Sequence, residues 1–248
     1  MMEIQSTEKY ILNEIKKQKK LCFPLIDSEN SFKTIELAGK LEELGASAIL
    51  VGGSSTSDQI ELSNFVTELK NNVEIPVILF PGNITGISRS ADAILFSSLL
   101  NSENPYYITG AQAQGALVIN KYNIEAIPTG YLIIGDGSTA WFIGQAKSIP
   151  FNKSNIAVMY ALAALYMGMR FLYLEAGSGA SQSIPPEMVS TVKKFYKGIL
   201  VVGGGINSAE VAKKISDAGA DIIVIGTMIE KEKDWESEFA NIIKAIRN

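Results

Sequence analysis

Short apolar segments alternate with amphipathic segments from one end of the chain to the other. Nearly continuous runs of strand-forming residues occupy segments 47–55, 171–177 and 198–206. Each run is followed by apolar residues at helical spacing. Such runs are typical of parallel strands that are covered on both faces. About eight strand–helix units in 248 residues predict an α/β fold, a TIM (β/α)8 barrel that forms a single domain over residues 1–248. An open, doubly wound sheet shares this alternation and is the alternative.

Residues 1–20 precede the first strand, and we expect them to form a helical extension of the barrel. Within residues 7–20, the apolar side chains of Tyr10, Ile11 and Ile15 share one helix face and the lysines occupy the other. The segment is polar and charged, which is not typical of a signal peptide, and no apolar run in the sequence is long enough to span a bilayer. These features predict a cytoplasmic protein.

The composition limits the chemistry that the chain can carry out. There is no histidine, and 22 basic against 26 acidic residues give a net charge of −4. No basic surplus indicates nucleic acid as a partner. Without histidine, proton transfer must use Glu, Asp, Tyr or Lys, and a metal must accept oxygen ligands, which favours Mg²⁺. The single cysteine, Cys22, excludes an intramolecular disulfide and suits a reducing compartment.

Polar and glycine-rich motifs follow the predicted strands at their carboxyl ends, which form the active-site face of a TIM barrel. The motifs are Asp27, Gly52-Gly53-Ser54, Pro81-Gly82-Asn83, Glu175-Ala176-Gly177-Ser178-Gly179, Gly203-Gly204-Gly205 and Gly226-Thr227. The last two motifs come from consecutive final strands, each before a helix. This pattern predicts a phosphate cup, because glycine lets backbone amides approach the oxygens and helix N-termini favour an anion. A simple tight turn at 203–205 is the alternative.

Acidic and hydroxyl side chains at three strand ends are candidates for the chemistry. Asp27 and Ser54 end the first two strands and could hold Mg²⁺ together with substrate phosphate. A helix cap explains Asp27 about equally well, and a turn explains Ser54 better than a metal site does. Glu175 ends a later strand, and Tyr173 lies two residues before it on the same side of that strand. A desolvated carboxylate there is a candidate base, and an ion pair at the rim is the alternative.

Aromatic residues cluster in two segments that read as loops. These residues, which lie near glycine and proline in the sequence, are Tyr106, Tyr107, Trp141 and Phe142. They could line an apolar groove or form an oligomer contact. Local packing of long loops accounts for them equally well.

Several motifs, in order, carry a family resemblance. They are "PLID", "ILVGGSS", "AILFSSLLNSENPYYITGAQ", "IPTGYLIIGDGSTAWFIGQAKSIP", "YLEAGSGA", "VVGGGI" and "IGT". Together the segments, from Leu21 to Ile229, resemble the geranylgeranylglyceryl phosphate synthase family, which includes the bacterial heptaprenylglyceryl phosphate synthases. The sequence looks like the longer, archaeal-type branch. "YLEAGSGA" with "NPYYITGAQ" is specific, whereas the glycine motifs alone are not.

The resemblance implies a Mg²⁺-dependent prenyltransferase that joins a polyprenyl diphosphate, expected to be geranylgeranyl diphosphate, to the primary hydroxyl of sn-glycerol 1-phosphate. The product is the ether-linked precursor of an archaeal-type lipid. Asp27 and Ser54 match the family's metal ligands, and Glu175 with Tyr173 would orient and deprotonate the glycerol hydroxyl. The residues that match the family's glycerol-phosphate site are Tyr173, Leu174, Glu175, Ala176, Gly177, Ser178, Gly179, Gly204, Gly205, Gly226 and Thr227. A homo-oligomer, a dimer or higher, and transient contact with a membrane surface are also expected.

The chain departs from the family near the first strand. Many relatives carry Asp-Pro-Asp-Lys where this chain has Asp27-Ser28-Glu29-Asn30, and the shorter branch has a lysine where this chain has Leu25. Mg²⁺, backbone amides or other cations must therefore meet the diphosphate charge, with Arg89 and Lys147 as candidates. The sequence does not fix the prenyl chain length. A sugar-phosphate isomerase or synthase of another phosphate-binding barrel, or a protein that binds a phosphorylated ligand without turnover, are the alternative functions.

Overall fold

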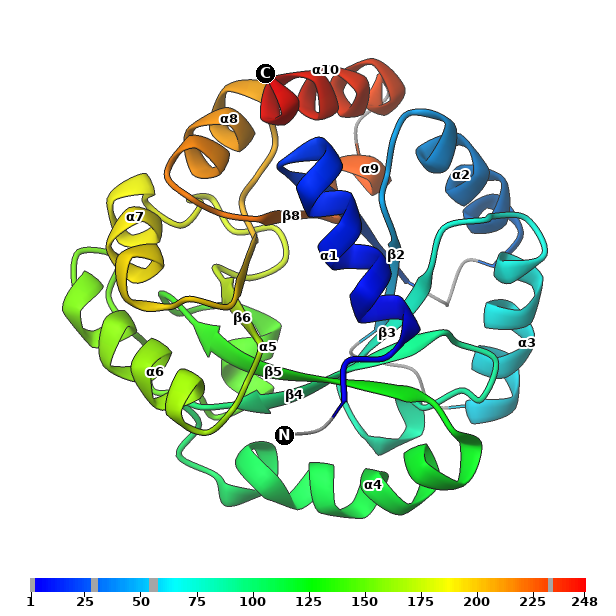
Figure 1. Cartoon of the computed structure of the whole chain (residues 1–248), viewed down its shortest axis with the longest axis horizontal. Coiled ribbons are helices and arrows are strands. Elements are labelled where there is room, and N and C mark those ends of the chain that lie inside the picture. The colour runs from blue at the N-terminus through cyan, green and yellow to red at the C-terminus, as the bar shows by residue number, and fades with distance from the viewer. Residues whose placement is uncertain (1–2, 28–30, 54–57, 232–233) are drawn as a thin grey trace.

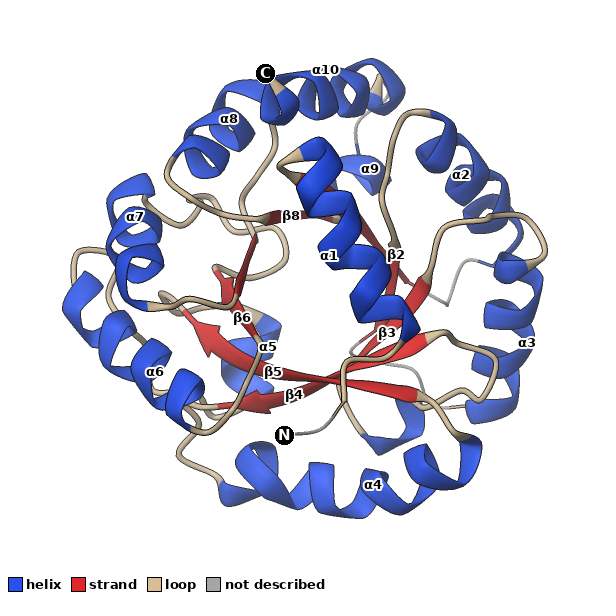
Figure 2. Cartoon of the chain, viewed as in Figure 1, coloured by secondary structure: helices blue, strands red, loops and turns tan. Residues whose placement is uncertain are grey.

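The chain folds into a closed barrel of parallel strands that is surrounded by helices (Figures 1 and 2). The computed structural model describes residues 3–27, 31–53, 58–231 and 234–248. Within these residues the strands are β1 (Leu21–Asp27), β2 (Ile49–Gly53), β3 (Val77–Pro81), β4 (Ala93–Leu99), β5 (Glu125–Ile133), β6 (Phe171–Glu175), β7 (Ile199–Gly203) and β8 (Ile222–Ile225). They pair in chain order, and β8 pairs with β1 to close the barrel. The predicted fold class is confirmed.

Helices cover the outside of the barrel, and most strands are followed by a helix, as the sequence predicts. The helices are α1 (Ser6–Gln18), α2 (Ser31–Glu43), α3 (Gln59–Lys70), α4 (Ala111–Tyr122), α5 (Thr139–Ile143), α6 (Ser154–Tyr166), α7 (Pro186–Phe195), α8 (Ala209–Asp217), α9 (Thr227–Lys231) and α10 (Trp235–Arg247). Between β3 and β4 the described chain makes only a short 3₁₀ helix, η2 (Ile84–Gly86). That strand–helix unit is therefore incomplete.

The segments predicted as aromatic loops are helical in the structure, so that part of the prediction is wrong. Tyr106 and Tyr107 belong to a π-helical segment, η3 (Tyr106–Gly110), which runs directly into α4. Trp141 and Phe142 belong to α5, which Ser138 caps by accepting a hydrogen bond from the Trp141 amide. Both segments are too short to show a helical period in the sequence.

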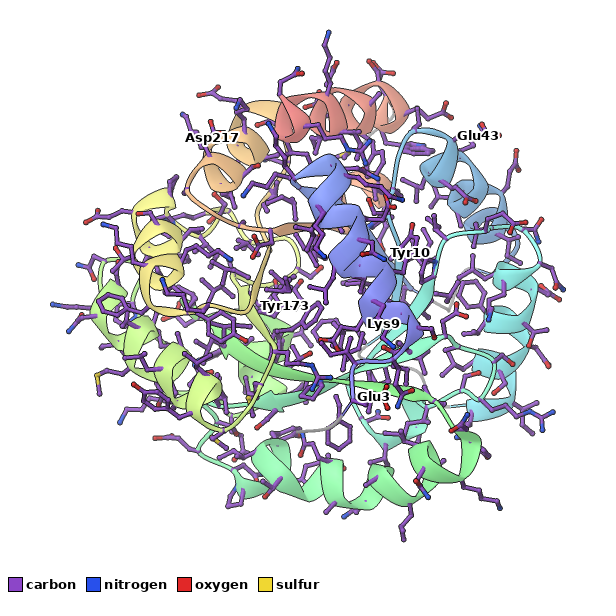
Figure 3. The ribbon with its side chains drawn as sticks, viewed as in Figure 1. Glu3, Lys9, Tyr10, Glu43, Tyr173 and Asp217 are labelled. Atoms are coloured by element: carbon purple, nitrogen blue, oxygen red, sulfur yellow. The ribbon has the colours of Figure 1, made fainter. Side chains whose placement is uncertain are left out.

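Helix α1 lies across one end of the barrel (Figure 1). It ends just before β1, and its first amides contact Glu125 at the start of β5, so it covers the amino ends of the strands. Tyr10 lies on α1, and Tyr173 lies inside the barrel, whereas Glu43 and Asp217 lie at the periphery (Figure 3). The helix therefore leaves the carboxyl ends of the strands open for a site. None of the described helices is long and apolar enough to cross a membrane.

Two apolar layers hold the fold together. One fills the barrel interior with alternate strand residues such as Phe23, Leu50 and Phe171. The other packs the opposite faces of the strands against the helices and includes Leu41, Phe65 and Phe239. Because both strand faces are buried, the strands read as continuous apolar runs in the sequence.

Candidate active site

A cavity of about 610 Å³ opens at the carboxyl ends of the strands. Glycine-rich segments and acids line one part of it, and apolar side chains line the other. The residues of the first part include Asp27, Glu175, Gly177, Ser178, Gly179, Gly204, Gly205, Gly226, Thr227 and Glu230. We call this part the polar arm. It brings together most of the site residues that the sequence predicts.

Glu175 is the last residue of β6 and is held inside the polar arm. Its backbone carbonyl accepts a hydrogen bond from the Ile134 amide at 2.8 Å, and β6 pairs it with Gly203 of β7. Its side chain is only 7% exposed, and Oε1 accepts a hydrogen bond from the Gly177 amide at 2.7 Å. Burial raises the pKa of Glu175, and the nearby Tyr173 hydroxyl and the Gly177 amide partly offset this. Among the described residues Glu175 forms no ion pair, which argues against the rim alternative.

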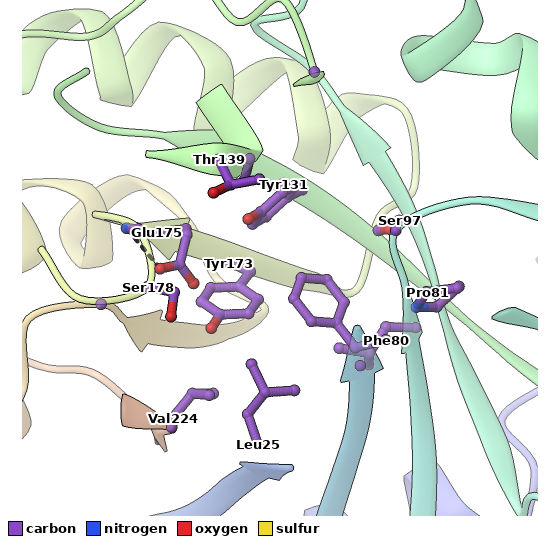
Figure 4. Close-up of a pocket in the computed structure, with 18 of the residues that line it drawn as sticks. Leu25, Phe80, Pro81, Ser97, Tyr131, Thr139, Tyr173, Glu175, Ser178 and Val224 are labelled. Atoms are coloured by element: carbon purple, nitrogen blue, oxygen red, sulfur yellow. Dashed lines mark hydrogen bonds between the residues drawn. The ribbon is translucent and has the colours of Figure 1, made fainter. Parts of the chain in front are cut away.

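Tyr173 lies beside Glu175 on the inner face of β6 (Figure 4). Its ring is fully buried, and its hydroxyl has no hydrogen-bond partner among the described residues. Burial, the Glu175 carboxylate and Tyr131 together raise the pKa of Tyr173 well above its usual value. The side chain is therefore a neutral phenol whose buried hydroxyl lies close to the Glu175 carboxylate but forms no hydrogen bond of ordinary geometry with a described residue. A buried hydroxyl of this kind is costly unless a ligand or water satisfies it.

The glycine segments shape a concave surface next to Glu175. Gly204 has a φ of +83°, and a Cβ there would lie 2.6 Å from both Glu175 Oε1 and the Gly177 nitrogen. Only glycine allows this approach. In the described part of the chain, the amides of Gly204 and Gly205 donate to no backbone carbonyl. Free amides in a left-handed turn form the type of surface that binds phosphate oxygens.

The segment 177–179 is fixed against the start of α9. The Gly179 amide donates a hydrogen bond to Thr227 Oγ1 at 3.0 Å, and Ser178 Oγ lies 3.2 Å from the same oxygen. The start of α8 is already bound by protein groups, because Glu238 Oε1 accepts from the Ala209 amide at 2.9 Å. An anion in the polar arm would therefore be bound mainly by loop amides and hydroxyls.

Leu174 and Ala176 do not line the cavity, although the sequence resemblance includes them in the glycerol-phosphate site. Leu174 is fully buried in the layer between strands and helices, because side chains alternate between the two faces of β6. The Ala176 amide donates to the Gly203 carbonyl at 3.1 Å, and its side chain is buried. Both residues support the polar arm from behind.

Asp27 ends β1 and lines the cavity, paired with Gly52 of β2. Its partner in the predicted metal site, Ser54, lies outside the described residues, and so do residues 28–30, where the chain departs from its family. The structure thus describes one member of the predicted pair. Its carboxylate oxygens are the ligand type that Mg²⁺ prefers.

The described side chains that line the cavity include three carboxylates and no lysine or arginine. The carboxylates belong to Asp27, Glu175 and Glu230. Arg89 and Lys147, the cations that the sequence offers for a diphosphate, are exposed and do not line the cavity. An anionic ligand therefore needs backbone amides, hydroxyls or a metal ion in the part of the site that the structure describes.

The other part of the cavity, which we call the apolar arm, runs between β3, β4, η3 and α4. Its lining includes Phe80, Ile87, Ile94, Leu95, Phe96, Leu99, Tyr107, Gly115, Ile119 and Ile143. Of the four aromatic residues that the sequence singles out, Tyr107 lines the cavity, whereas Phe142 is 72% exposed. Sequence reasoning missed the rest of this arm, because apolar residues in strands are typical of a core.

Phe80 and Tyr131 are two further residues that sequence reasoning missed. Both line the cavity where the polar arm meets the apolar arm, close to Tyr173. The only available signal was their place near the carboxyl ends of their strands, next to Pro81-Gly82 and ahead of Gly135.

Comparison with known proteins gives consistent matches along the whole chain. The sequence pattern of the PcrB family matches residues 13–246. The chain is 57% identical to geranylgeranylglyceryl phosphate synthase of Nitrosopumilus maritimus over 97% of this chain and 96% of the relative. It is 51% identical to the enzyme of the same name from Pyrococcus horikoshii, over 100% and 97% of the two chains.

A solved structure has the same fold. The crystal structure of (S)-3-O-geranylgeranylglyceryl phosphate synthase from Thermoplasma acidophilum, in complex with its substrate sn-glycerol-1-phosphate, superposes with a TM-score of 0.91. The two sequences are 34% identical, and the match covers 100% of this chain and 99% of the other.

Proposed function

This chain belongs to the PcrB family, and we propose that it joins a polyprenyl diphosphate to the free primary hydroxyl of sn-glycerol 1-phosphate. The product is a glyceryl ether of the prenyl chain, and diphosphate is released. One observation carries the proposal: a single cavity combines a glycine-lined polar arm beside a buried carboxylate with a long apolar arm. Relatives that share this sequence carry the name of that activity.

The polar arm suits glycerol phosphate. Hydrogen-bond donors for the phosphate are available from the amides of Gly204 and Gly205 and from the hydroxyls of Ser178 and Thr227. Glu175 and the hydroxyl of Tyr173 then face the glycerol moiety. The Tyr173 hydroxyl would donate to one glycerol oxygen, and the Glu175 carboxylate would accept from another.

The apolar arm suits the prenyl chain of the donor, with its diphosphate near Asp27. A magnesium ion there would suit the residues present, because the carboxylate of Asp27 offers hard oxygen ligands and no described basic side chain lines the cavity to neutralise the diphosphate. Bound Mg²⁺ would neutralise the negative charge that develops on the departing diphosphate. Asp27 would hold it, with Ser54 as the second protein ligand expected from the sequence.

The reaction breaks the bond between C1 of the donor and its diphosphate oxygen, and the electron pair leaves with the diphosphate. The primary hydroxyl oxygen of glycerol phosphate forms a bond to C1, and its proton passes to the Glu175 carboxylate. The raised pKa of Glu175 makes it a stronger base than an exposed carboxylate. Holding both substrates in one cavity supplies the required alignment.

The apolar arm also separates this proposal from its alternatives. An isomerase or synthase that acts on sugar phosphates, or a protein that binds a phosphorylated ligand without turnover, would use the polar arm and would need no apolar arm. The arm here is lined by side chains of two strands, η3 and α4. We therefore favour a substrate with a long apolar chain.

We further propose that the protein forms a homo-oligomer through α6. This helix has no charged residue from Ser154 to Tyr166, and its outer face exposes Met159 (68%) and Tyr166 (81%). The structure leaves one apolar face of this helix uncovered. A second copy of the chain is the occupant that best matches an uncharged face, because two identical neutral surfaces can pack without leaving a charge unpaired. Brief contact with a membrane surface would accompany release of the lipid product.

A turnover assay tests the proposal. Purified protein receives Mg²⁺, sn-glycerol 1-phosphate and prenyl diphosphates of several lengths, and the ether product is measured by mass spectrometry. We expect product that disappears with EDTA and falls at least about 100-fold in Asp27→Ala. Exchange of Glu61, which is exposed on α3, for alanine is the matched control and should not change the rate. Folded protein that binds glycerol phosphate and yields no product with any donor would contradict the proposal.

A further inference from the structure

Asn101 follows β4 at the carboxyl end of the barrel, and it is almost completely buried (1% exposed). Its side-chain amide bonds only to main-chain atoms. Oδ1 accepts a hydrogen bond from the Ile133 amide at 3.1 Å, and Nδ2 donates to the carbonyls of Ile133 and Lys147, each at 2.9 Å. Both donors and the acceptor of the side chain are thus in use, which fixes its orientation.

The Asn101 side chain extends the sheet beyond the end of β4. The register of β4 and β5 ends at the pair Leu99 and Tyr131. The main chain then turns away from β5, because the Ser102 amide donates a hydrogen bond back to the Leu99 carbonyl at 3.1 Å. Asn101 bonds both main-chain groups of Ile133, as a further strand residue would do. The last residue of β5 is therefore held on its β4 side by one side chain.

The other side of the same β5 end holds Glu175. Ile133 pairs with Glu175 in the register of β5 and β6, and the next amide, that of Ile134, donates to the Glu175 carbonyl at 2.8 Å. The connection from Asn101 to the main chain of Glu175 thus runs through the end of β5 alone. A shift of this strand end would move the main chain from which the Glu175 side chain extends.

A second contact joins the segment after β5 to the Glu175 carboxylate. The Gly177 amide donates to Glu175 Oε1 at 2.7 Å (Figure 4). Gly177 has a φ of +109°, and a Cβ there would collide with the Cβ of Ser138, which follows β5 and caps α5. The segment after β5 therefore packs closely against the residue that orients the carboxylate. Both supports of Glu175 depend on where β5 ends.

We propose that Asn101 is a positioning residue for the reaction, which fixes the end of β5 and thereby holds Glu175 where it accepts the glycerol proton. This inference rests on the proposed function. Asn101 does not line the cavity, so it contacts neither substrate and acts through the main chain of β5. The proton still passes from the primary hydroxyl of glycerol phosphate to Glu175, and no bond forms or breaks at Asn101.

Stabilisation of the fold is the competing explanation, because buried hydrogen bonds also support the folded state. Loss of a residue that only stabilises the fold lowers the rate whichever side chain stands at position 175. Loss of a residue that acts through Glu175 lowers the rate only while Glu175 is present. A double-mutant cycle separates the two cases, because it measures how far the effects of two changes depend on each other.

The experiment combines Asn101→Ser with Glu175→Gln and measures the single-turnover rate with Mg²⁺, sn-glycerol 1-phosphate and geranylgeranyl diphosphate. We expect Asn101→Ser alone to lower the rate about 10- to 50-fold, because a misplaced base loses its alignment with the hydroxyl. In the Glu175→Gln protein the same change should alter the rate by less than about twofold. Asn101→Asp, which keeps the shape of the side chain and the acceptor for the Ile133 amide, is the second variant if Asn101→Ser does not fold.

Thr129→Val is the matched control. Thr129 is fully buried on β5, and its hydroxyl donates to the Ile127 carbonyl at 2.9 Å, far from the end of the strand that Asn101 holds. The variant loses a buried hydrogen bond of the same strand without releasing Glu175. We expect its rate to stay within about twofold of the wild type.

The pH profile gives a second readout that a purely structural role would not change. Among the described residues, the titratable side chains that face Glu175 are the phenols of Tyr131 and Tyr173, which stay neutral because burial raises their pKa. Burial also raises the pKa of Glu175, and a loosened carboxylate would admit water. The acidic limb of kcat/KM should therefore move to lower pH in Asn101→Ser and stay in place in Thr129→Val.

The outcomes separate this inference from the proposed function. Equal losses of rate in the two backgrounds, an unmoved acidic limb, or a fully active Asn101→Ser protein would overturn the inference and leave the prenyl transfer intact. Failure of both Asn101 variants to fold would assign the residue to folding alone and would overturn it as well. An inactive wild-type protein would reject the proposed function itself.

Discussion

At the scale of single residues, Glu175 combines burial with a directed hydrogen bond. The Gly177 amide fixes one carboxylate oxygen, and the rest of the group faces the cavity. The raised pKa means that the ionised form is disfavoured in the folded state. Ionisation of Glu175 therefore lowers the folding stability as pH rises above the ordinary value of 4.5. The same shift makes the Glu175 carboxylate a stronger base.

We predict that Glu175→Gln lowers kcat/KM at least about 100-fold, because the amide cannot accept the glycerol proton. Removal of a buried charge should leave the melting temperature at neutral pH unchanged or higher. In the wild type, kcat/KM should fall as pH decreases through the raised pKa, with an acidic limb above the ordinary value of 4.5. Steady-state kinetics against pH and calorimetry measure both. A variant that is less stable yet fully active would contradict the base assignment.

A pair of glycines tests the phosphate surface. Gly204 and Gly168 have nearly the same φ, +83° and +81°, but a Cβ at Gly204 would collide with Glu175 Oε1 and at Gly168 would meet nothing within 4 Å. Gly204→Ala should raise KM for glycerol phosphate more than about tenfold, whereas Gly168→Ala should cost only about 1 kcal/mol of stability. Equal KM values in the two variants would show that the 203–205 turn does not bind phosphate.

The sequence predicts some of these residues and not others, for physical reasons. Glu175 stands out because an acid at the end of an apolar strand is unusual. Phe80 and Tyr131 do not stand out, since an aromatic residue in a buried strand is the ordinary case. They line one cavity because the closed barrel brings together strands that are far apart in the sequence.

At the scale of elements, α1 is attached to the barrel by charged side chains from other elements. Glu125 of β5 accepts hydrogen bonds from the Thr7 and Glu8 amides at 2.6 and 2.8 Å, so it caps the helix from a distance. Arg170 donates two hydrogen bonds to the Glu8 carboxylate at 2.6 and 2.7 Å. The sequence predicts the helix from its apolar face but gives no sign of its partners, which lie more than 100 positions away.

We predict that Glu8→Ala lowers the free energy of unfolding by about 2–3 kcal/mol, because it leaves the Arg170 guanidinium partly buried and unpaired. Glu210→Ala is the matched control, since Glu210 pairs with Lys214 at the surface of α8 and its loss should change stability little. Urea denaturation measures both. Equal effects would show that the pair at α1 is no stronger than a surface pair.

At the scale of the whole molecule, the closed barrel places the helix that covers it and the cavity at opposite ends of the strands. α1 covers the amino ends of the strands, and the two arms of the cavity open at the carboxyl ends. The alternation of strands and helices predicts this plan. The short helices η2, η3, α5 and α9 could not be predicted, because each is fixed by tertiary packing and is too short to show its own periodicity.

The apolar outer face of α6 is a property of the assembled molecule. We predict that Met159→Glu separates the oligomer into smaller species, because it buries an unpaired charge in the proposed interface. Ile60→Glu is the matched control, since Ile60 is similarly exposed (72%) on α3. Light scattering after size exclusion measures the mass of each variant. A wild-type protein that is already monomeric, or a Met159 variant of unchanged mass, would contradict the assignment of α6.

The measurement that tests the central claim most directly is a comparison of the two enantiomers of glycerol phosphate as acceptors. Each is offered with Mg²⁺ and geranylgeranyl diphosphate under identical conditions, and ether product is quantified. The account predicts product from sn-glycerol 1-phosphate at a rate at least about 100-fold above that from the 3-phosphate, because Glu175 and the glycine surface fix the hydroxyl relative to the phosphate. Equal rates, or no ether product from either enantiomer, would contradict it.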